Sequence, residues 1–255
     1  MKVVLVPSSS GVERSYHYLS SYVIDDSVAI DAGGLGFHGD LVAQGKIRHI
    51  FLTHTHLDHT ASLPIFLENV YGVIPEGVVI HGSATVLDSL QKDIFNDRVM
   101  PDFIRISHER KPAFLRLAPL EENKTVEVEG LRITPVEVNH VVPTFSFVIE
   151  GKQTAVAVVT DTAPTKAVWK RLERTPNLKA VFLEASFPNE MAFLAKISGH
   201  LTSDQFHEEA AKVGPEVQVI AVHLKARTHD QTVSEVMGRG LPNIQIAEPG
   251  RVYEF

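Results

Sequence analysis

The segment from His49 to His59, which reads HIFLTHTHLDH, constrains what this chain can fold into more than any other feature. The apolar run at its start is typical of a buried strand. Three imidazoles and one carboxylate follow within six residues. Imidazoles so close together repel one another when protonated, and they lose hydration when buried without partners. A divalent cation that accepts their lone pairs removes both costs, so the pattern predicts a metal site at the end of a strand.

The arrangement of ligands in this segment favours two metal ions over one. In an extended turn His54 and His56 project to the same side, while Asp58 and His59 begin the next turn. The chain has 13 histidines and no cysteine, so any transition-metal site must use imidazole and carboxylate. We expect two divalent ions, with zinc as the first choice and manganese or iron as alternatives. The competing interpretation is a solvated histidine-rich loop.

Three further polar residues come directly after apolar strands. His140, Asp161 and His223 each lie at the place where open α/β folds put their sites. One such residue alone is more often an ordinary loop residue, but three of them beside the histidine cluster favour metal binding. The expected ligands are therefore His54, His56, Asp58, His59, His140, Asp161 and His223.

The pattern of apolar runs predicts an α/β fold with two sheets and helices outside, in a single domain over residues 1–255. The expected strands are Val3–Val6, Ser20–Ile24, Val28–Asp31, His49–Leu52, Val78–His81, Thr125–Val128, Leu131–Val138, Phe145–Ile149, Thr154–Thr160, Ala180–Glu184, Gln218–His223 and Asn243–Ile246. The expected helices are Ser83–Phe95, Ala163–Arg174 with Pro164 in its first turn, Thr202–Val213 with Thr202 as N-cap, and Thr232–Arg239. We expect Phe95–Leu120, which contains three prolines, to be an irregular crossing segment.

Charge and hydropathy limit the partners. The formal net charge is -7, which disfavours a nucleic-acid polymer because basic patches normally supply that affinity. No apolar run approaches the roughly 20 residues that span a bilayer, and the first residues lack a secretory apolar core. We therefore expect a cytoplasmic protein that does not bind membranes.

Several motifs resemble those of one enzyme superfamily. His54-Thr55-His56-Leu57-Asp58-His59 resembles the HxHxDH signature of the metallo-β-lactamase superfamily, and Asp31 resembles the aspartate of its first motif. The chain is more narrowly similar to the class II 3′,5′-cyclic-nucleotide phosphodiesterases. The stretches that carry this similarity are 19–22, 56–59, 94–97, 101–103, Glu184-Ala185-Ser186-Phe187-Pro188, Ser198-Gly199-His200-Leu201-Thr202 and His223-Leu224-Lys225. Gly33-Gly34-Leu35-Gly36 lacks the spacing of a phosphate-binding loop, and we interpret it as a backbone turn under the metal site.

The resemblance implies an αββα sandwich of two mixed β-sheets with outer helices, the metallo-β-lactamase fold. It implies that one metal is bound by His54, His56 and His140 and the other by Asp58, His59 and His223, with Asp161 bridging them. It also implies that Glu184 orients His200 as a general acid. A helix-capping histidine is the alternative for His200.

The expected reaction is metal-dependent hydrolysis of a phosphodiester. A hydroxide held between two metals suits in-line attack, and the cations neutralise charge on the phosphate oxygens. We expect Asp58, His200 and Glu184 to be catalytic. Lys225 and His200 would contact the substrate phosphate, although a solvated lysine is an alternative for Lys225.

The expected substrates are 3′,5′-cyclic nucleotides, cAMP or cGMP, hydrolysed to 5′-nucleotides. The alternatives are a tRNA 3′-processing endonuclease like ribonuclease Z, a β-lactamase or thioesterase on the same fold, and a non-catalytic metal-binding module. We find no basic arm for tRNA. A homodimer is a prior expectation. His17 and the segment 95–103 could line the pocket, but we favour a surface position for His17 and ordinary packing for 95–103.

Overall fold

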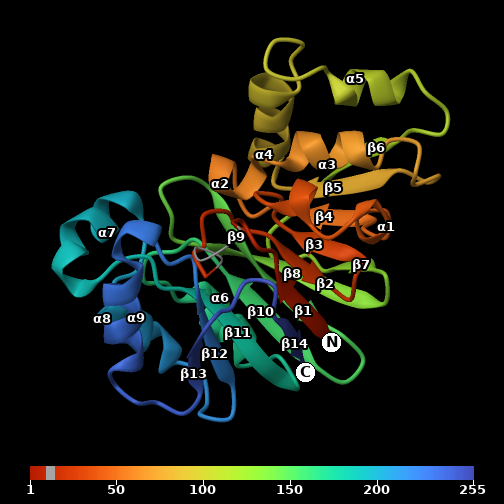
Figure 1. The fold of residues 1–255 in the computed structure, drawn as a ribbon. Helices are drawn as coiled ribbons and strands as arrows, with labels where there is room; N and C mark the ends of the chain where they lie inside the picture. The colour runs from red at the N-terminus through yellow and green to blue at the C-terminus, as the bar shows by residue number, and fades with distance from the viewer. Residues whose placement is uncertain (10–14) are drawn as a thin grey trace.

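The computed structural model describes residues 1–9 and 15–255. In this part of the chain, two seven-stranded sheets lie face to face (Figure 1). The first sheet has the strand order β14-β1-β2-β3-β4-β5-β6, and the second has the order β13-β12-β11-β10-β9-β8-β7. Each sheet is mixed, because β3 to β6 and β10 to β13 run parallel while the other pairs are antiparallel.

The bounds of the elements follow the apolar patterning closely. The first sheet contains β1 (Lys2–Leu5), β2 (Tyr22–Ile24), β3 (Val28–Ile30), β4 (His49–Phe51), β5 (Val78–Gly82), β6 (Leu115–Pro119) and β14 (Val252–Glu254). The second contains β7 (Val126–Val128), β8 (Leu131–Val138), β9 (Thr144–Glu150), β10 (Ala155–Val159), β11 (Leu178–Glu184), β12 (Gln218–Val222) and β13 (Ile244–Ile246). The α-helices are α1 (Leu41–Gln44), α2 (Leu57–Thr60), α3 (Leu63–Asn69), α4 (Ala84–Ser89), α5 (Phe103–His108), α6 (Ala167–Leu172), α7 (Ala192–Ser198), α8 (Ser203–Ala210) and α9 (His229–Met237).

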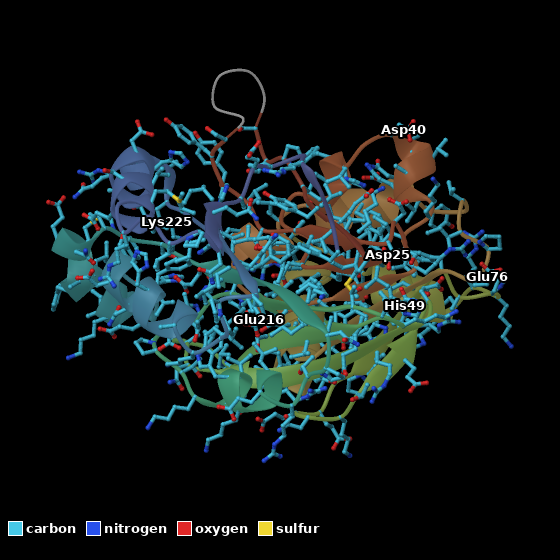
Figure 2. All side chains as sticks on the ribbon, turned by 90° about the horizontal axis from the view of Figure 1, so that it is seen from below. Asp25, Asp40, His49, Glu76, Glu216 and Lys225 are labelled. Atoms are coloured by element: carbon cyan, nitrogen blue, oxygen red, sulfur yellow. The ribbon has the colours of Figure 1, made fainter. Side chains whose placement is uncertain are left out.

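Apolar side chains fill three layers. Phe51, Phe147 and Phe182 belong to the core between the two sheets. Helices α3 and α4 cover the outer face of the first sheet, and α6 and α8 cover that of the second through Trp169 and Phe206. Charged side chains such as Asp40 and Glu76 lie at the margin (Figure 2). This αββα arrangement confirms the expected fold.

Two expectations about individual elements were wrong. The segment Phe95–Leu120 is not irregular, because it contains α5 and the edge strand β6. Helix α6 begins at Ala167, not at Ala163, so Pro164 lies before its first turn. The reason is that Asn139 holds this segment as a loop, with its backbone carbonyl accepting from the Ala163 N–H at 2.6 Å and its side chain donating to the Pro164 carbonyl at 2.6 Å.

The start of α8 is as expected. Thr202 is the N-cap, and its side chain accepts a hydrogen bond from the Gln205 N–H while the Gln205 side chain accepts from the Thr202 N–H. This reciprocal arrangement satisfies two backbone donors that a helix start otherwise leaves unpaired. It fixes where the helix begins, only two residues after His200.

The sheet topology places the site. Strands β10, β11 and β12 are parallel, so the residues that follow them, Asp161, Glu184 at the last position of β11, and His223, meet at one sheet edge. Strand β4 of the other sheet ends just before the histidine segment. Among the described residues, no helix has the length and apolar character needed to cross a bilayer.

Candidate metal centre

The seven expected ligands form two adjoining groups. His54, His56, His140 and Asp161 offer ligand atoms that all lie within 4.8 Å of one another. Asp58, His59, Asp161 and His223 form the second such group, so Asp161 belongs to both. The segment after β4 thus meets residues from the ends of β8, β10 and β12. The structure brings together every residue that the sequence suggested for this centre.

Buried polar atoms at the centre lack hydrogen-bond partners. Within residues 1–9 and 15–255, the buried atoms His54 Nε2, His59 Nε2 and Asp161 Oδ1 have none. Buried side-chain nitrogens and oxygens nearly always have a partner, so unpaired ones here require an explanation. The distance from Asp161 Oδ2 to His59 Nε2 is 3.3 Å and to His54 Nε2 is 3.8 Å. Lone pairs that converge in this way fit a divalent cation bound by imidazole and carboxylate.

Asp31 orients the ring of His59 by a hydrogen bond to its Nδ1. It is buried directly after β3, and its Oδ2 accepts a hydrogen bond from His59 Nδ1 at 2.7 Å. The Thr53 N–H donates to its Oδ1 at 2.8 Å. Because Nδ1 of His59 carries the proton of this bond, its Nε2 is free as a ligand atom. Asp31 therefore fixes both the tautomer and the ring orientation of one ligand.

The electrostatic environment favours positive charge. Burial opposes protonation of His59, but Asp161 and Asp31 outweigh it and raise the pKa of that imidazole well above its usual range. Burial and the neighbouring His59 lower the pKa of His54 well below its usual range. Despite its burial, Asp58 has a lowered pKa because His223 donates a hydrogen bond to it and His59 lies close by. A bound cation would be stabilised by these same carboxylates.

Gly33 lies directly under the second ligand group. The Asp58 carbonyl accepts a hydrogen bond from the Ser20 N–H at 2.8 Å, and the Gly33 N–H donates to the Ser20 carbonyl at 3.0 Å. A Cβ atom at Gly33 would lie 1.9 Å from the Asp58 carbonyl oxygen. Only glycine allows so close a backbone approach. The turn expected under the metal site is thus in contact with the ligand segment.

His140 and His223 are each oriented by a second contact. His140 Nδ1 donates to the Gly199 carbonyl at 2.9 Å, which turns its Nε2 toward His56. His223 has a positive φ of 59° and lies with its Nε2 3.1 Å from Asp58 Oδ2. A non-glycine residue in this backbone region is uncommon and is often found at functional sites.

Glu184 and His200 form a buried pair beside the ligand groups. His200 Nδ1 lies 3.0 Å from Glu184 Oε1, and the His200 ring centroid lies 5.0 Å from that of His140 and 5.4 Å from that of His223. Burial lowers the proton affinity of His200, but the Glu184 carboxylate outweighs it and raises the pKa of the imidazole above its ordinary value. Glu184 also accepts from the Thr162 N–H at 2.5 Å, next to Asp161.

Ser186 is a contact residue that the sequence reasoning did not single out. Its buried hydroxyl donates to Glu184 Oε2 at 2.6 Å and lies 3.1 Å from His223 Nδ1. It therefore connects the Glu184–His200 pair to a ligand. The only signal was its place in the quoted Glu184–Pro188 motif, which gives no reason for a serine at that position.

Lys225 reaches the second ligand group. Its Nζ lies 3.2 Å from His223 Nε2 and 3.6 Å from Asp58 Oδ2, while a third of the side chain remains exposed. An ammonium group at this position can meet an anionic substrate as it approaches the centre. The geometry fits the expected contact with a phosphate better than it fits a freely solvated lysine.

The structure shows the surroundings of His17 and of the segment 95–103. The favoured surface position for His17 is wrong, because the residue is buried and its Nε2 donates to the Ala247 carbonyl at 3.0 Å. Burial lowers its pKa to about 4. Phe95 and Phe103 pack in the core beneath the outer helices, with ring centroids 5.5 Å apart.

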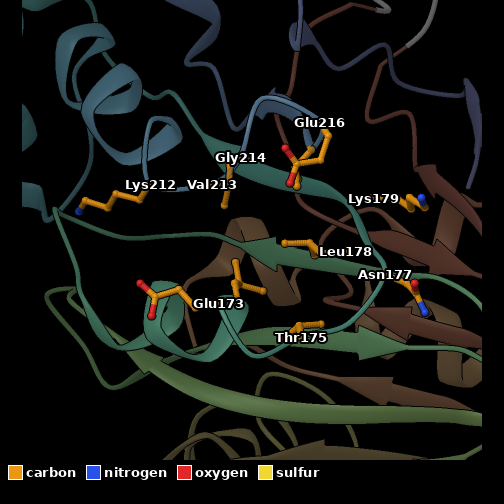
Figure 3. A pocket seen from close by; sticks show the side chains of 11 residues that line it. Glu173, Thr175, Asn177, Leu178, Lys179, Lys212, Val213, Gly214 and Glu216 are labelled. Atoms are coloured by element: carbon orange, nitrogen blue, oxygen red, sulfur yellow. The ribbon is translucent and has the colours of Figure 1, made fainter.

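A cavity lies at a different edge of the second sheet from the candidate centre. A cavity of about 410 Å³ lies near the amino ends of β11 and β12, lined in part by Glu173, Lys179, Lys212 and Glu216 (Figure 3). Because the strands are parallel, this edge of the sheet lies opposite the edge that carries Asp161 and His223. It holds none of the expected ligands.

Comparison with known proteins identifies the family. A model described as a β-lactamase superfamily domain matches residues 34–224, a range that includes all seven expected ligands and the Glu184–His200 pair. The chain belongs to the β-lactamase superfamily. Its two sheets and histidine-rich centre make it a hydrolase of the metallo-β-lactamase fold.

Two of the relatives found carry the names of different enzymes. A Yersinia pestis protein named "Probable 3′,5′-cyclic-nucleotide phosphodiesterase" is 24% identical over 218 residues, which is 80% of this chain and 60% of that protein. A Ribonuclease Z of Chlamydia muridarum (strain MoPn / Nigg) is 34% identical over 106 residues, which is 41% of this chain and 33% of that protein. The chain thus spans less than two thirds of the length of either relative.

A solved structure shows the same fold over nearly the whole chain. Unliganded yeast PDE1 superposes with a TM-score of 0.78 and 16% sequence identity, and the alignment covers 98% of each chain. At this identity the similarity concerns the fold alone. It agrees with the expected αββα fold.

Proposed function

We propose that this superfamily member is a phosphodiesterase that uses two divalent metal ions to hydrolyse 3′,5′-cyclic nucleotides to 5′-nucleotides. The observation that carries the proposal is the Glu184–His200 pair, which lies against two ligand groups that share Asp161. Hydrolysis of a phosphodiester requires charge neutralisation at the phosphate and a proton for the leaving oxygen. The two ligand groups serve the first need and the histidine–carboxylate pair the second.

The residues that would hold the metals follow from the two groups. His54, His56 and His140 would hold one ion and Asp58, His59 and His223 the other, and Asp161 belongs to both groups. Two divalent ions, when bound, supply Lewis-acid charge to a phosphate and lower the pKa of water. Zinc suits this set of nitrogen and oxygen donors, and manganese or iron are alternatives.

The chain's own proton transfer rests on His200. Glu184 holds the Nδ1 proton of His200, so the Nε2 proton of the protonated ring is available to the leaving oxygen. The Glu184 carboxylate raises the pKa of His200 and so favours the protonated ring. Lys225 orients the substrate by meeting a phosphate oxygen beside His223 and Asp58. Asp58 would take part by holding the ion of the second ligand group, and Lys225 Nζ lies 3.6 Å from Asp58 Oδ2.

Two observations support a small cyclic substrate. The relative of Yersinia pestis carries a cyclic-nucleotide name, and its similarity extends over most of this chain. The chain's charge of -7 disfavours a long polyanion. We also propose a cytoplasmic, homodimeric protein without membrane partners.

A tRNA 3′-processing endonuclease is the second candidate. The 34% identity to a Ribonuclease Z favours it, although that match covers a shorter part of the chain. A β-lactamase or thioesterase activity does not call for the buried Glu184–His200 pair.

One set of assays tests these assignments. Purified protein is analysed for metal, and kcat/KM is measured on cAMP, cGMP, 2′,3′-cyclic nucleotides, bis-p-nitrophenyl phosphate, a tRNA precursor and a β-lactam. We expect the highest value on a 3′,5′-cyclic nucleotide, with loss of activity on His200→Ala and none on the exposed His108→Ala. Negligible turnover of every 3′,5′-cyclic nucleotide would refute the proposal.

A further inference from the structure

Four apolar side chains around the candidate centre are exposed to solvent. Leu57 is 69% exposed, Val141 54%, Phe193 76% and Ile197 55%. We call these four residues the apolar rim. Scattered exposed apolar residues are ordinary, but a group of them next to a polar centre marks a surface that contacts something else.

The rim residues are tied to the centre by the chain itself. Leu57 follows the expected ligand His56, and Val141 follows His140, whose ring lies 5.1 Å from that of His56 between centroids. The Val141 nitrogen lies 3.0 Å from where a Cβ of Gly199 would be, so this strand end touches the end of α7. The end of α7 therefore lies against the segment that carries His140, and Leu57 and Val141 each follow an expected ligand directly.

Helix α7 presents its apolar side outward. Ala195 is its one buried residue, while Phe193 and Ile197 lie one turn apart and share an exposed face. The helix ends at Gly199, which has a positive φ of 71°, and His200 comes next. Figure 1 shows α7 at the margin of the molecule. A helix that served only packing would turn these two side chains toward the core.

We propose that the apolar rim binds the nucleobase of the substrate, with the Phe193 ring stacking on the face of the base. This inference rests on the proposed function, which places the phosphate at the metal centre. In a nucleotide the base is separated from the phosphate by one sugar, so it emerges beside the centre and not within it. Phe193 supplies an aromatic ring, which suits the flat face of a base.

The size of the rim disfavours a protein partner. Stable protein interfaces bury roughly 800 Å² on each side and involve about 20–30 residues. Four side chains supply only a small part of such a surface. They are sufficient to cover a single base.

The test compares ligands with and without a base. Metal-loaded protein is titrated calorimetrically with 5′-AMP and with ribose 5-phosphate, in the wild type and in Phe193→Ser, Phe193→Trp and Phe37→Ser. Phe37 is the matched control, because it is 62% exposed and lies outside the rim. We expect Phe193→Ser to weaken 5′-AMP binding by about tenfold, since a stacked base contributes on that order. Ribose 5-phosphate should bind equally to all four proteins, and Phe193→Trp should retain 5′-AMP affinity.

Other results would overturn the inference. Equal weakening of both ligands in Phe193→Ser would mean that the residue acts on the centre as a whole. Unchanged 5′-AMP affinity in Phe193→Ser would mean that the rim does not bind a base. A change from dimer to monomer in Phe193→Ser, without a change in 5′-AMP affinity, would mean the same. Binding is measured separately from turnover, so failure of the proposed hydrolysis would show instead as wild-type protein that binds 5′-AMP but leaves cyclic nucleotides intact.

Discussion

Replacing Gly33 by alanine should disrupt the second ligand group through the backbone. The added Cβ would lie 1.9 Å from the Asp58 carbonyl oxygen and 2.9 Å from the Ser20 nitrogen. Both contacts are with backbone atoms, so no flexible side chain can move aside. The segment that carries Asp58 must therefore shift by about 1 Å or more, and overpacked positions of this kind are destabilising.

The size of the effect can be worked from the hydrogen bonds that the shift breaks. The Ser20 N–H donates to the Asp58 carbonyl at 2.8 Å, and both groups are left unpaired if the segment moves. Each unpaired buried group costs about 1–3 kcal/mol, so we expect the free energy of unfolding to fall by roughly 2–6 kcal/mol. Because the segment that carries Asp58 would be displaced, metal binding should also weaken by about 10- to 100-fold.

The neighbouring glycine provides the control. At Gly34 the nearest atom to an added Cβ is the Val6 Cγ1 at 3.7 Å, an ordinary contact, and φ is -110°. Gly34→Ala should change the free energy of unfolding by less than about 0.5 kcal/mol. Urea unfolding of metal-free protein, with metal content after gel filtration, measures both effects. A Gly33→Ala protein with wild-type stability and full metal content would refute this reasoning.

Three further outcomes are expected. His200→Ala should retain both metals by elemental analysis and lower kcat by about 10²–10⁴-fold, as for other general acids, and a protein that loses its metals instead would make His200 a ligand. Asp161→Ala should lose metal and activity together, because Asp161 belongs to both ligand groups; full metal content in this variant would contradict the shared role. Burial lowers the pKa of His81 to about 4, so the native state resists protonation and stability is lost as the pH falls from about 6.5 to 4. His81→Gln should therefore flatten the dependence of the unfolding free energy on pH in this window, by up to about 3 kcal/mol, and an unchanged slope in urea titrations would exclude His81 as the cause.

The strands were predictable because their apolar residues are buried in the core and form continuous runs in the sequence. Runs such as those at β8 and β12 are long, rich in β-branched residues and end at a polar residue. The edge strand β6 was missed because only Leu115 is buried in it and a proline ends it. Helix α7 was missed for a related reason, since its apolar residues face outward and no core pattern marks them.

The clustering of the expected ligands was predictable from the sequence, but the contacts that support them were not. Histidines and aspartates at strand ends carry a local signal, because each follows an apolar run directly. The contact between Gly33 and Asp58 joins residues 25 positions apart, and that between His140 and Gly199 joins residues 59 apart. Such contacts depend on which strands become neighbours, which the pattern of one strand does not specify.

The position of the two ligand groups between the sheets also has a mechanical consequence. His54 and His59 follow β4 of the first sheet, whereas His140, Asp161 and His223 follow strands of the second. A cation bound by both His54 and His140 would therefore join the two sheets of the sandwich at one end. Force applied between the sheets would be carried first by metal–ligand bonds there, and only by apolar packing at the opposite end.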